Sequence, residues 1–325
     1  MTKSRDKSSQ QIVAIVGPTA VGKTNLVLQL ANHLAGEIVN VDSMQIYRYM
    51  DIGTAKPSRE EQQTVRHHLI DIVNPDEEYN VSLFINDAER VCSDIISRSK
   101  LPILTGGTGL YLKGFQDGVF DVAGDGAIAD DEAALQIRAR LDNELLEKGR
   151  AHLFARLQKC DGVSAARIHP NDTYRLLRAL QVFEQTGIPW SVHLARQQQA
   201  VIDSNHRSIL KIGLTCDREQ LYERINERTK QMFETGLLDE VRKLLDMGYG
   251  PNLKAMQSIG YRHAVKFLAG DWDKDETLRI MARDTRRYAK RQFTWFKKDQ
   301  QISWFAPGQV AEIYRTITKY LDESL

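Results

Sequence analysis

Short apolar runs alternate with amphipathic segments along the first part of the chain. We predict strands at Ile12–Val16, Glu37–Val41, Leu69–Val73 and Leu101–Thr105. Between the last two, the segment Val81–Ser99 carries apolar residues at the spacing of a helix. Strands that alternate with helices are typical of a parallel sheet covered by helices on both faces. The pattern therefore predicts an α/β domain.

The pattern changes to almost wholly helical in the middle of the chain. Helices are predicted there at Glu132–Lys148, His152–Lys159, Asn171–Thr186 and Trp190–Gln199. A further strand follows at Ile209–Leu214, and the remaining sequence is mostly helical up to a predicted strand at Gln301–Phe305. We therefore predict an α/β core of residues 1–118 and 208–325, interrupted by an inserted all-helical domain of residues 119–207.

A glycine-rich sequence directly follows the first predicted strand and fits the pattern G-x-x-x-x-G-K-[ST]. In a strand–turn–helix context, the backbone N–H groups of such a turn converge on one point and favour anionic oxygens there. Lys23 adds a positive charge, and the Thr24 hydroxyl can ligate a magnesium ion that bridges two phosphate groups. The phosphate compound itself is not specified by the pattern. The predicted phosphate-binding residues are Gly17, Pro18, Thr19, Ala20, Val21, Gly22, Lys23 and Thr24.

Two further predicted strands end in residues that suit the same site. Asp42 follows the second strand, and Thr108 lies in the glycine turn that follows the fourth. Because the carboxyl ends of parallel strands meet at one edge of the sheet, both residues are expected beside the phosphate loop. Asp42 suits three roles: holding magnesium through water, taking a proton from an attacking group, or capping the next turn as a structural carboxylate.

The C-terminal part carries a local excess of positive charge, although the net charge of the whole chain is only +1. Residues 286–298 read RRYAKRQFTWFKK, with six basic residues, no acidic residue and four aromatic residues. Basic groups neutralise phosphates and aromatic rings stack on unpaired bases, but an amphipathic helix with a solvated basic face explains the stretch equally well. A second basic stretch lies at Tyr174–Arg178. Together with the phosphate loop, these stretches favour an enzyme that acts on RNA.

Composition argues against several other classes of protein. The 42% of hydrophobic and 27% of charged residues are typical of a globular protein in solution. The first ten residues lack the apolar segment of a secretory signal, and no apolar run approaches the length of a membrane span. Cys92, Cys160 and Cys216 share no C-x-x-C pattern, so neither structural disulfides nor a zinc site is expected. We expect a cytoplasmic monomer with no membrane partner.

In combination, the motifs resemble the tRNA dimethylallyltransferases of bacterial type, also called tRNA isopentenyltransferases. That family transfers a dimethylallyl group from dimethylallyl diphosphate to the exocyclic N6 amine of the adenosine just 3′ of the anticodon. Its phosphate loop holds a diphosphate leaving group where kinases hold ATP, and the C-terminal zinc finger of its eukaryotic members is not found here. The motifs, which fall in order over nearly the whole chain, are GPTAVGKT (17–24), VDSMQIYRYMDIGTAKP (41–57), HHLIDI (67–72), LTGGTGLYL (104–112), RIHPND (167–172), SIGYR (258–262) and KRQFTWF (290–296).

The resemblance implies a phosphate-loop fold and roles for individual residues. It implies that Asp42 is the base near the N6 amine and that Thr108 contacts the substrate. It implies that Arg228 joins Lys23 and Thr24 at the diphosphate, with magnesium at Thr24. The start of the insertion, residues 119–131, matches no pattern of the family. Contacts with the anticodon stem-loop of tRNA are expected from Asp42, Ser43, Met44, Gln45, Arg138, Tyr174, Arg175, Leu176, Leu177, Arg178, Gln257, Ser258, Ile259, Gly260, Tyr261, Arg262 and Arg291.

Three alternatives from other classes stay open at this point. A kinase for a small metabolite would account for the phosphate loop and Asp42, but not for the basic aromatic stretch. An adenylate isopentenyltransferase, with a free nucleotide as acceptor, has the same diphosphate site but no need of an anticodon clamp. A nonenzymatic RNA-binding or switch protein would leave the diphosphate chemistry unused. A transfer assay separates these possibilities.

Overall fold

The computed structural model describes residues 11–118, 132–203 and 209–323. The chain divides into two compact units. The sheet unit comprises residues 1–79, 87–112 and 207–325, and the helical unit comprises residues 80–86 and 113–206. The segment 119–131, where the predicted insertion begins, lies outside the described residues.

A fully parallel sheet of six strands, in the order β3-β2-β4-β1-β5-β6, forms the centre of the sheet unit. The middle strand β1 is at most 1% exposed, and its Val13 pairs with Ile103 on one side and with Leu210 on the other. The predicted α/β fold with a parallel sheet is therefore confirmed. The strands are β1 (Ile12–Val16), β2 (Gly36–Val41), β3 (His67–His68), β4 (Leu101–Gly106), β5 (Ile209–Leu214) and β6 (Ser303–Phe305).

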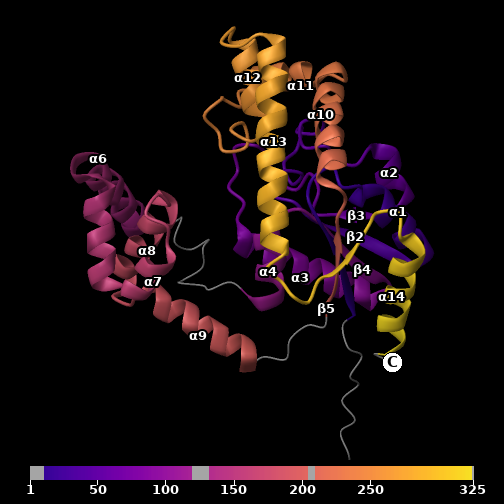
Figure 1. Ribbon diagram of the computed structural model, residues 1–325, viewed down its shortest axis with the longest axis horizontal. Helices are drawn as coiled ribbons and strands as arrows, with labels where there is room; N and C mark the ends of the chain where they lie inside the picture. Colours follow the sequence, from indigo (N-terminus) through magenta and orange to yellow (C-terminus); the bar gives the residue numbers. More distant parts are fainter. Residues whose placement is uncertain (1–10, 119–131, 204–208, 324–325) are drawn as a thin grey trace, which may run out of the picture. The chain divides into compact units, whose positions relative to one another are not determined.

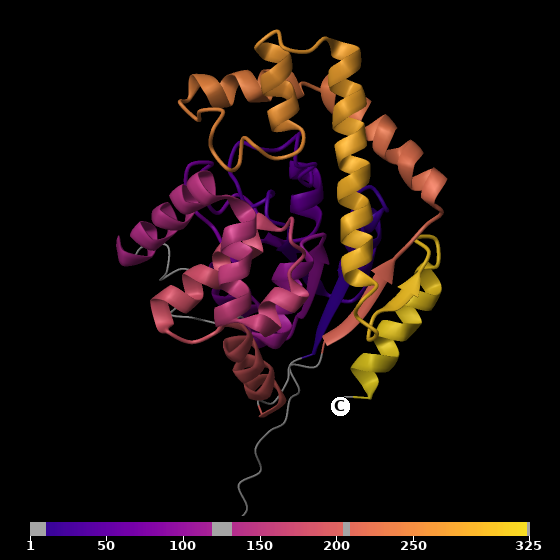
Figure 2. The same ribbon diagram turned by 60° about the vertical axis from the view of Figure 1, so that its left-hand side comes forward.

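Helices pack on the sheet (Figure 1). Leu26 and Leu30 of α1 share one hydrophobic core with Ile313 and Ile317 of α14, and α14 lies alongside β5 (Figure 2). Two helices, α3 (Val81–Ser97) and α4 (Gly109–Asp117), have residues in both units. The other helices of the sheet unit are α1 (Lys23–His33), α2 (Arg59–Thr64), α10 (Arg218–Glu234), α11 (Leu237–Asp246), α12 (Tyr261–Leu268), α13 (Lys274–Phe296) and α14 (Val310–Asp322).

Two long helices of the sheet unit, α10 and α13, pack against each other, and α13 runs down to the sheet in both views (Figures 1 and 2). Asp217 caps the N-terminus of α10, because its side chain accepts hydrogen bonds from the backbone N–H groups of Glu219 and Gln220. Among the described residues, no helix is both long and apolar enough to cross a membrane.

The third predicted strand, Leu69–Val73, is wrong in its position. The strand β3 contains only His67 and His68, which pair with Ile38 and Val39 of β2. Leu69 and Asp71 have φ angles of 60° and 55°, in the left-handed region, where a strand cannot continue. Beyond them, Val73 forms only an isolated parallel bridge with Tyr47.

The described part of the helical unit is built around a separate apolar core. Its largest helix, α6, is broken at Gly149, whose φ of 78° separates the two helices that the sequence predicts. Leu141 and Leu153, from either side of the break, pack with Leu176 and Leu180 of α8. The helices that lie wholly in this unit are α6 (Glu132–Cys160), α7 (Gly162–Arg167), α8 (Thr173–Thr186) and α9 (Trp190–Asp203).

Candidate active site

A cavity of about 860 Å³ lies at the carboxyl edge of the sheet. The phosphate loop, the segments after β2 and β4, and the helices α10 and α13 all contribute to its lining. It brings together many residues that the sequence places far apart. The predicted site residues that line it are Thr19, Ala20, Gly22, Lys23, Thr24, Asp42, Ser43, Met44, Gln45, Arg228, Ser258, Ile259, Arg262 and Arg291.

The phosphate loop has the local geometry of an anion site. Gly22 precedes α1 with a φ of 107°, and no side chain caps the helix there, so the first N–H groups of α1 are left for a ligand. Lys23 Nζ donates hydrogen bonds to the backbone oxygens of Gly17 at 2.9 Å and Pro18 at 2.8 Å. Burial lowers the pKa of Lys23 to about 8, while the charge of Asp42 opposes that shift.

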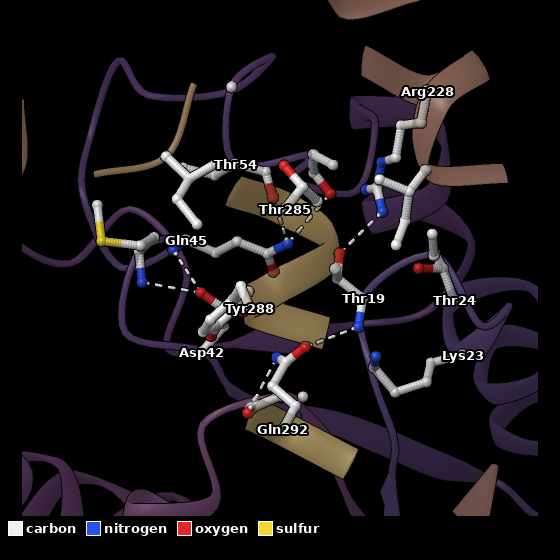
Figure 3. A pocket seen from close by; sticks show the side chains of 18 of the residues that line it. Thr19, Lys23, Thr24, Asp42, Gln45, Thr54, Arg228, Thr285, Tyr288 and Gln292 are labelled. Atoms are coloured by element: carbon white, nitrogen blue, oxygen red, sulfur yellow. Dashed lines mark hydrogen bonds between the residues drawn. The ribbon is translucent and has the colours of Figure 1, made fainter. Parts of the chain in front are cut away.

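Thr19, in the middle of the loop, is held from both long helices (Figure 3). Arg228 of α10 donates from Nη1 to Thr19 Oγ1 at 3.4 Å. Gln292 of α13 accepts at Oε1 from the backbone N–H of Thr19 at 2.9 Å, and its Nε2 donates to the backbone oxygen of Gly107 at 3.1 Å. Burial lowers the pKa of Arg228, and nearby Asp42 counteracts this effect. The loop is therefore fixed by side chains that the two helices bring to it.

Asp42 is oriented by the turn that follows β2. Its Oδ1 accepts hydrogen bonds from the backbone N–H groups of Met44 at 2.8 Å and Gln45 at 3.3 Å. Thr108 does not line the cavity; its Oγ1 accepts from the backbone N–H of Ser43 at 3.0 Å and so supports the same turn. Asp42 Oδ2 has no hydrogen-bond partner among the described residues, and the side chain lies at the cavity. One oxygen thus caps the turn, and the other is available to a substrate.

One face of α13 supplies polar groups that the sequence analysis did not assign to the site. Thr285, Tyr288 and Gln292 follow one another at helical spacing, and all line the cavity together with Met281. Burial and the nearby charge of Asp42 raise the pKa of Tyr288, so its hydroxyl keeps its proton. The sequence signal was this polar stripe within a helix; residues 286–298 were interpreted either as an RNA-binding stretch or as an amphipathic helix with a solvated basic face.

Comparison with known protein families covers most of the chain. The family model described as IPP transferase matches residues 45–299. This chain belongs to the IPP transferase family. A second model, described as Isopentenyl transferase, matches residues 10–75, which include the phosphate loop and Asp42.

Similar members of the IPP transferase family come from bacteria. The tRNA dimethylallyltransferase of Desulfotalea psychrophila is 48% identical over 320 residues, which cover 98% of each chain. That of Geobacter sulfurreducens is 47% identical and covers 91% of this chain and 92% of the relative.

Solved structures are similar over most of their length too. The tRNA isopentenylpyrophosphate transferase from Bacillus halodurans is 40% identical, with a TM-score of 0.69, and covers 97% of this chain and 98% of its own. A eukaryotic dimethylallyltransferase acting on tRNA is 28% identical, with a TM-score of 0.69, and covers 88% of this chain and 69% of its own. These structures share the phosphate-loop fold predicted for this IPP transferase.

Some residues implied as tRNA contacts in this IPP transferase are buried. Leu176 and Leu177 are 0% and 2% exposed and belong to the core of the helical unit, because the helix period turns these two positions inward. Gly260 is buried too, and the side chain of Tyr261 is 0% exposed and donates to Glu240 at 2.5 Å. The side chains of Leu176, Leu177 and Tyr261 therefore offer no exposed surface to tRNA, and contact with tRNA at these four positions stays a prediction.

Other implied contacts lie at surfaces. In the helical unit, Tyr174 and Arg175 are exposed on α8, Arg178 is half-buried on the same helix, and Arg138 pairs with Asp142 on α6. In the sheet unit, the exposed residues are Gln257 and Arg291, and the guanidinium of Arg291 lies 5.7 Å from the centroid of the Tyr288 ring.

Proposed function

We propose that this protein transfers a dimethylallyl group from dimethylallyl diphosphate to the N6 amine of the adenosine 3′ of the anticodon in tRNA, and releases diphosphate. The observation that carries the proposal is the composition of one cavity. Lys23, Thr24 and Arg228 form a phosphate side, while Asp42 and Gln45 form an acceptor side (Figure 3). Membership in the IPP transferase family and the names of the similar bacterial proteins support this assignment.

The phosphate side suits the ionisation of an allylic diphosphate. Breaking the carbon–oxygen bond gives a delocalised allylic cation and puts negative charge on the diphosphate that leaves. Lys23, Arg228 and the N–H groups at the start of α1 are preorganised for that charge, so they stabilise the transition state more than the ground state. The planar guanidinium of Arg228 can hold two phosphate oxygens at once.

The phosphate side suits a magnesium ion that binds to Thr24 together with the diphosphate of the substrate. Thr24 offers an exposed hydroxyl beside the loop, and the described residues contain no group of three or more His, Cys, Asp or Glu side chains that could hold a metal. Since Mg²⁺ binds oxygen and keeps several waters, we infer that the diphosphate and water would supply its other ligands. When bound there, it would neutralise charge on the diphosphate.

The acceptor side suits an exocyclic amine. Such an amine is a poor nucleophile because its lone pair is delocalised into the ring. Asp42 Oδ2 can accept a hydrogen bond from N6 and then take its proton, while Oδ1 stays fixed by Met44 and Gln45. A stacked base cannot reach this cavity, so the adenosine must be extruded from the anticodon loop.

Basic side chains of the cavity lining suit the phosphates that flank the extruded base. Arg262, Arg283, Arg287 and Arg291 all line the cavity. We further propose that residues 119–207 form an inserted tRNA-binding domain and that residues 1–118 and 208–325 form the catalytic core. On the insertion, the proposed contacts are Arg138, Tyr174, Arg175 and Arg178. A monomeric state and a cytoplasmic location stay predictions.

The test is a transfer assay with labelled dimethylallyl diphosphate and unmodified tRNA. We expect label on the adenosine 3′ of the anticodon, without added ATP, and no transfer to tRNA that already carries the group. A strict requirement for ATP would favour a kinase instead. Equal transfer to free adenosine monophosphate would favour an adenylate isopentenyltransferase, and the absence of any transfer would contradict all prenyl-transfer functions.

A further inference from the structure

The carboxylate of Glu240, on α11, accepts hydrogen bonds from three successive backbone N–H groups of one loop. Asp51 and Ile52 donate to Oε2 at 2.9 and 2.8 Å, and Gly53 donates to Oε1 at 3.2 Å. The hydroxyl of Tyr261 donates to the same Oε1 at 2.5 Å. Four donors therefore converge on one carboxylate, and each of them loses its partner if the carboxylate is removed.

The continuation of this loop holds the side chain of Gln45. Gln45 Nε2 donates to the backbone oxygens of Thr54 at 3.1 Å and Ala55 at 3.0 Å (Figure 3). Because both partners are acceptors, they fix which end of the amide is the nitrogen, and Gln45 Oε1 is the end left to accept a hydrogen bond. Gln45, Thr54 and Ala55 all line the cavity, and Figure 3 shows Gln45 and Thr54 on the side of Asp42.

The loop is tightly packed at the point where Glu240 binds it. A Cβ atom at Gly53 would lie 2.4 Å from the ring of Tyr261, so the backbone packs directly on that ring. Lys56, whose side chain is 2% exposed, donates to Asp51 at 2.5 Å and to Asp71 at 2.6 Å. The segment from Asp51 to Lys56 is therefore held at both of its ends.

We propose that Glu240 is a positioning residue for the acceptor side of the cavity. By holding the loop at Asp51, Ile52 and Gly53, it sets the backbone oxygens that orient Gln45 beside Asp42. Its hydrogen bonds go to the loop and Tyr261, and they include no residue of the phosphate side. This inference rests on the proposed function, because the proposed function assigns the two sides of the cavity to the two substrates.

The test compares Glu240→Gln and Glu240→Ala with Asp239→Asn. Asp239 is the adjacent acidic residue on α11, is 80% exposed in its side chain, and pairs with Arg242, so it is a matched control. We expect kcat/KM for tRNA to fall about tenfold to hundredfold in Glu240→Ala and less in Glu240→Gln, as the loss of hydrogen bonds to a charged group predicts. The Kd of dimethylallyl diphosphate should stay within about twofold of wild type, because Glu240 bonds to no phosphate-side residue.

Hydrogen exchange provides a readout that does not depend on catalysis. The backbone amides of residues 51–53 should exchange at least about tenfold faster in Glu240→Ala, since these amides lose their acceptor. If Glu240→Ala does not fold, Glu240→Gln and Tyr261→Phe serve in its place, because both keep the packing and weaken the same group of bonds.

Specific results would overturn the inference. Wild-type tRNA kinetics in the Glu240 variants, or an equal loss of dimethylallyl diphosphate binding, would show that Glu240 does not position the acceptor side. An absence of transfer by the wild-type protein would instead contradict the proposed function. In that case, unchanged exchange of amides 51–53 in the Glu240 variants would separately contradict the anchoring role, and faster exchange would support it.

Discussion

Gln292 accepts a hydrogen bond from the backbone N–H of Thr19 at 2.9 Å, and this bond ties the basic helix α13 to the phosphate loop. The other end of the same amide donates to Gly107, in the turn after the neighbouring strand β4. Gln292 is only 5% exposed, so water cannot easily replace either bond. A helix proposed to contact tRNA is thus joined to the loop proposed to hold the diphosphate.

The first prediction concerns the stability provided by this amide. Gln292→Leu should lower the free energy of unfolding by about 1–3 kcal/mol, because it leaves a buried carbonyl and an amide of the loop without partners. Urea denaturation measures the change. Thr294→Ala is the control, since Thr294 is exposed on the same helix and its hydroxyl donates only to the backbone oxygen of Lys290. Equal unfolding free energies in the two variants would show that the amide contributes nothing.

The second prediction separates the charge of Asp42 from its place in the turn. In Asp42→Asn, the remaining oxygen can still accept from Met44 and Gln45, so the turn should persist. Single-turnover transfer should slow by roughly 10²- to 10⁴-fold, as expected for the loss of a general base. The Kd of tRNA should change little. Near-normal turnover would mean that Asp42 acts only as a turn cap.

The third prediction is a dependence of diphosphate binding on pH. Burial lowers the pKa of Lys23 to about 8, so the side chain is charged below that pH and neutral above it. Because the charged form attracts the anion, the Kd of dimethylallyl diphosphate should rise by only about twofold between pH 7 and 8 and by up to about tenfold per pH unit above pH 8. Calorimetric titration at a series of pH values measures this Kd.

The control variants for this pH effect are Lys23→Met and Lys230→Met. The first should bind weakly at every pH and lose the change in slope near pH 8. The second should behave like wild type, because Lys230 is exposed on α10 and does not line the cavity. A slope change that persists in Lys23→Met would assign the titration to another group.

The fourth prediction concerns the geometry of Arg228. Arg228→Lys keeps the charge but loses the planar group that can bind two oxygens, so the Kd of inorganic diphosphate should rise about tenfold. Binding of tRNA should not change, because the substitution affects the phosphate side of the cavity. Arg218→Lys, at an exposed position at the start of the same helix, is the control. Diphosphate binding like that of wild type would show that Arg228 is not part of the phosphate side.

The phosphate loop and Asp42 could be located from the sequence because each depends on local signals. An apolar strand followed by glycines fixes the loop at Gly17–Thr24, and the parallel order of the sheet brings Asp42 to the same edge. Strand β3 could not be located in the same way. The apolar run from which the strand was predicted lies after β3, and its Leu69 is buried. The left-handed backbone at Leu69 and Asp71 makes this run part of a loop and not of the sheet.

The role of Gln292 could not be predicted, because it depends on contacts between segments that are distant in the chain. Its sequence neighbours are basic and aromatic, and they favour interpreting α13 as an RNA-binding surface. The sequence did not indicate a role for Glu240 either, because single acidic residues are common on amphipathic helices. The burial of Leu176 and Leu177 could have been foreseen, because the helix period turns part of any continuous range of a helix inward.

The central strand β1 gains its two neighbours at different times during synthesis. Ile15 pairs with Thr105 of β4 and with Ile212 of β5, and residues 113–206, the larger part of the helical unit, are encoded between those two partners. Until β5 has left the ribosome, the sequence IVAIV has one bare edge and no charged side chain to block its pairing with another chain. Chains truncated before residue 209 should therefore aggregate through the strand that begins the sheet.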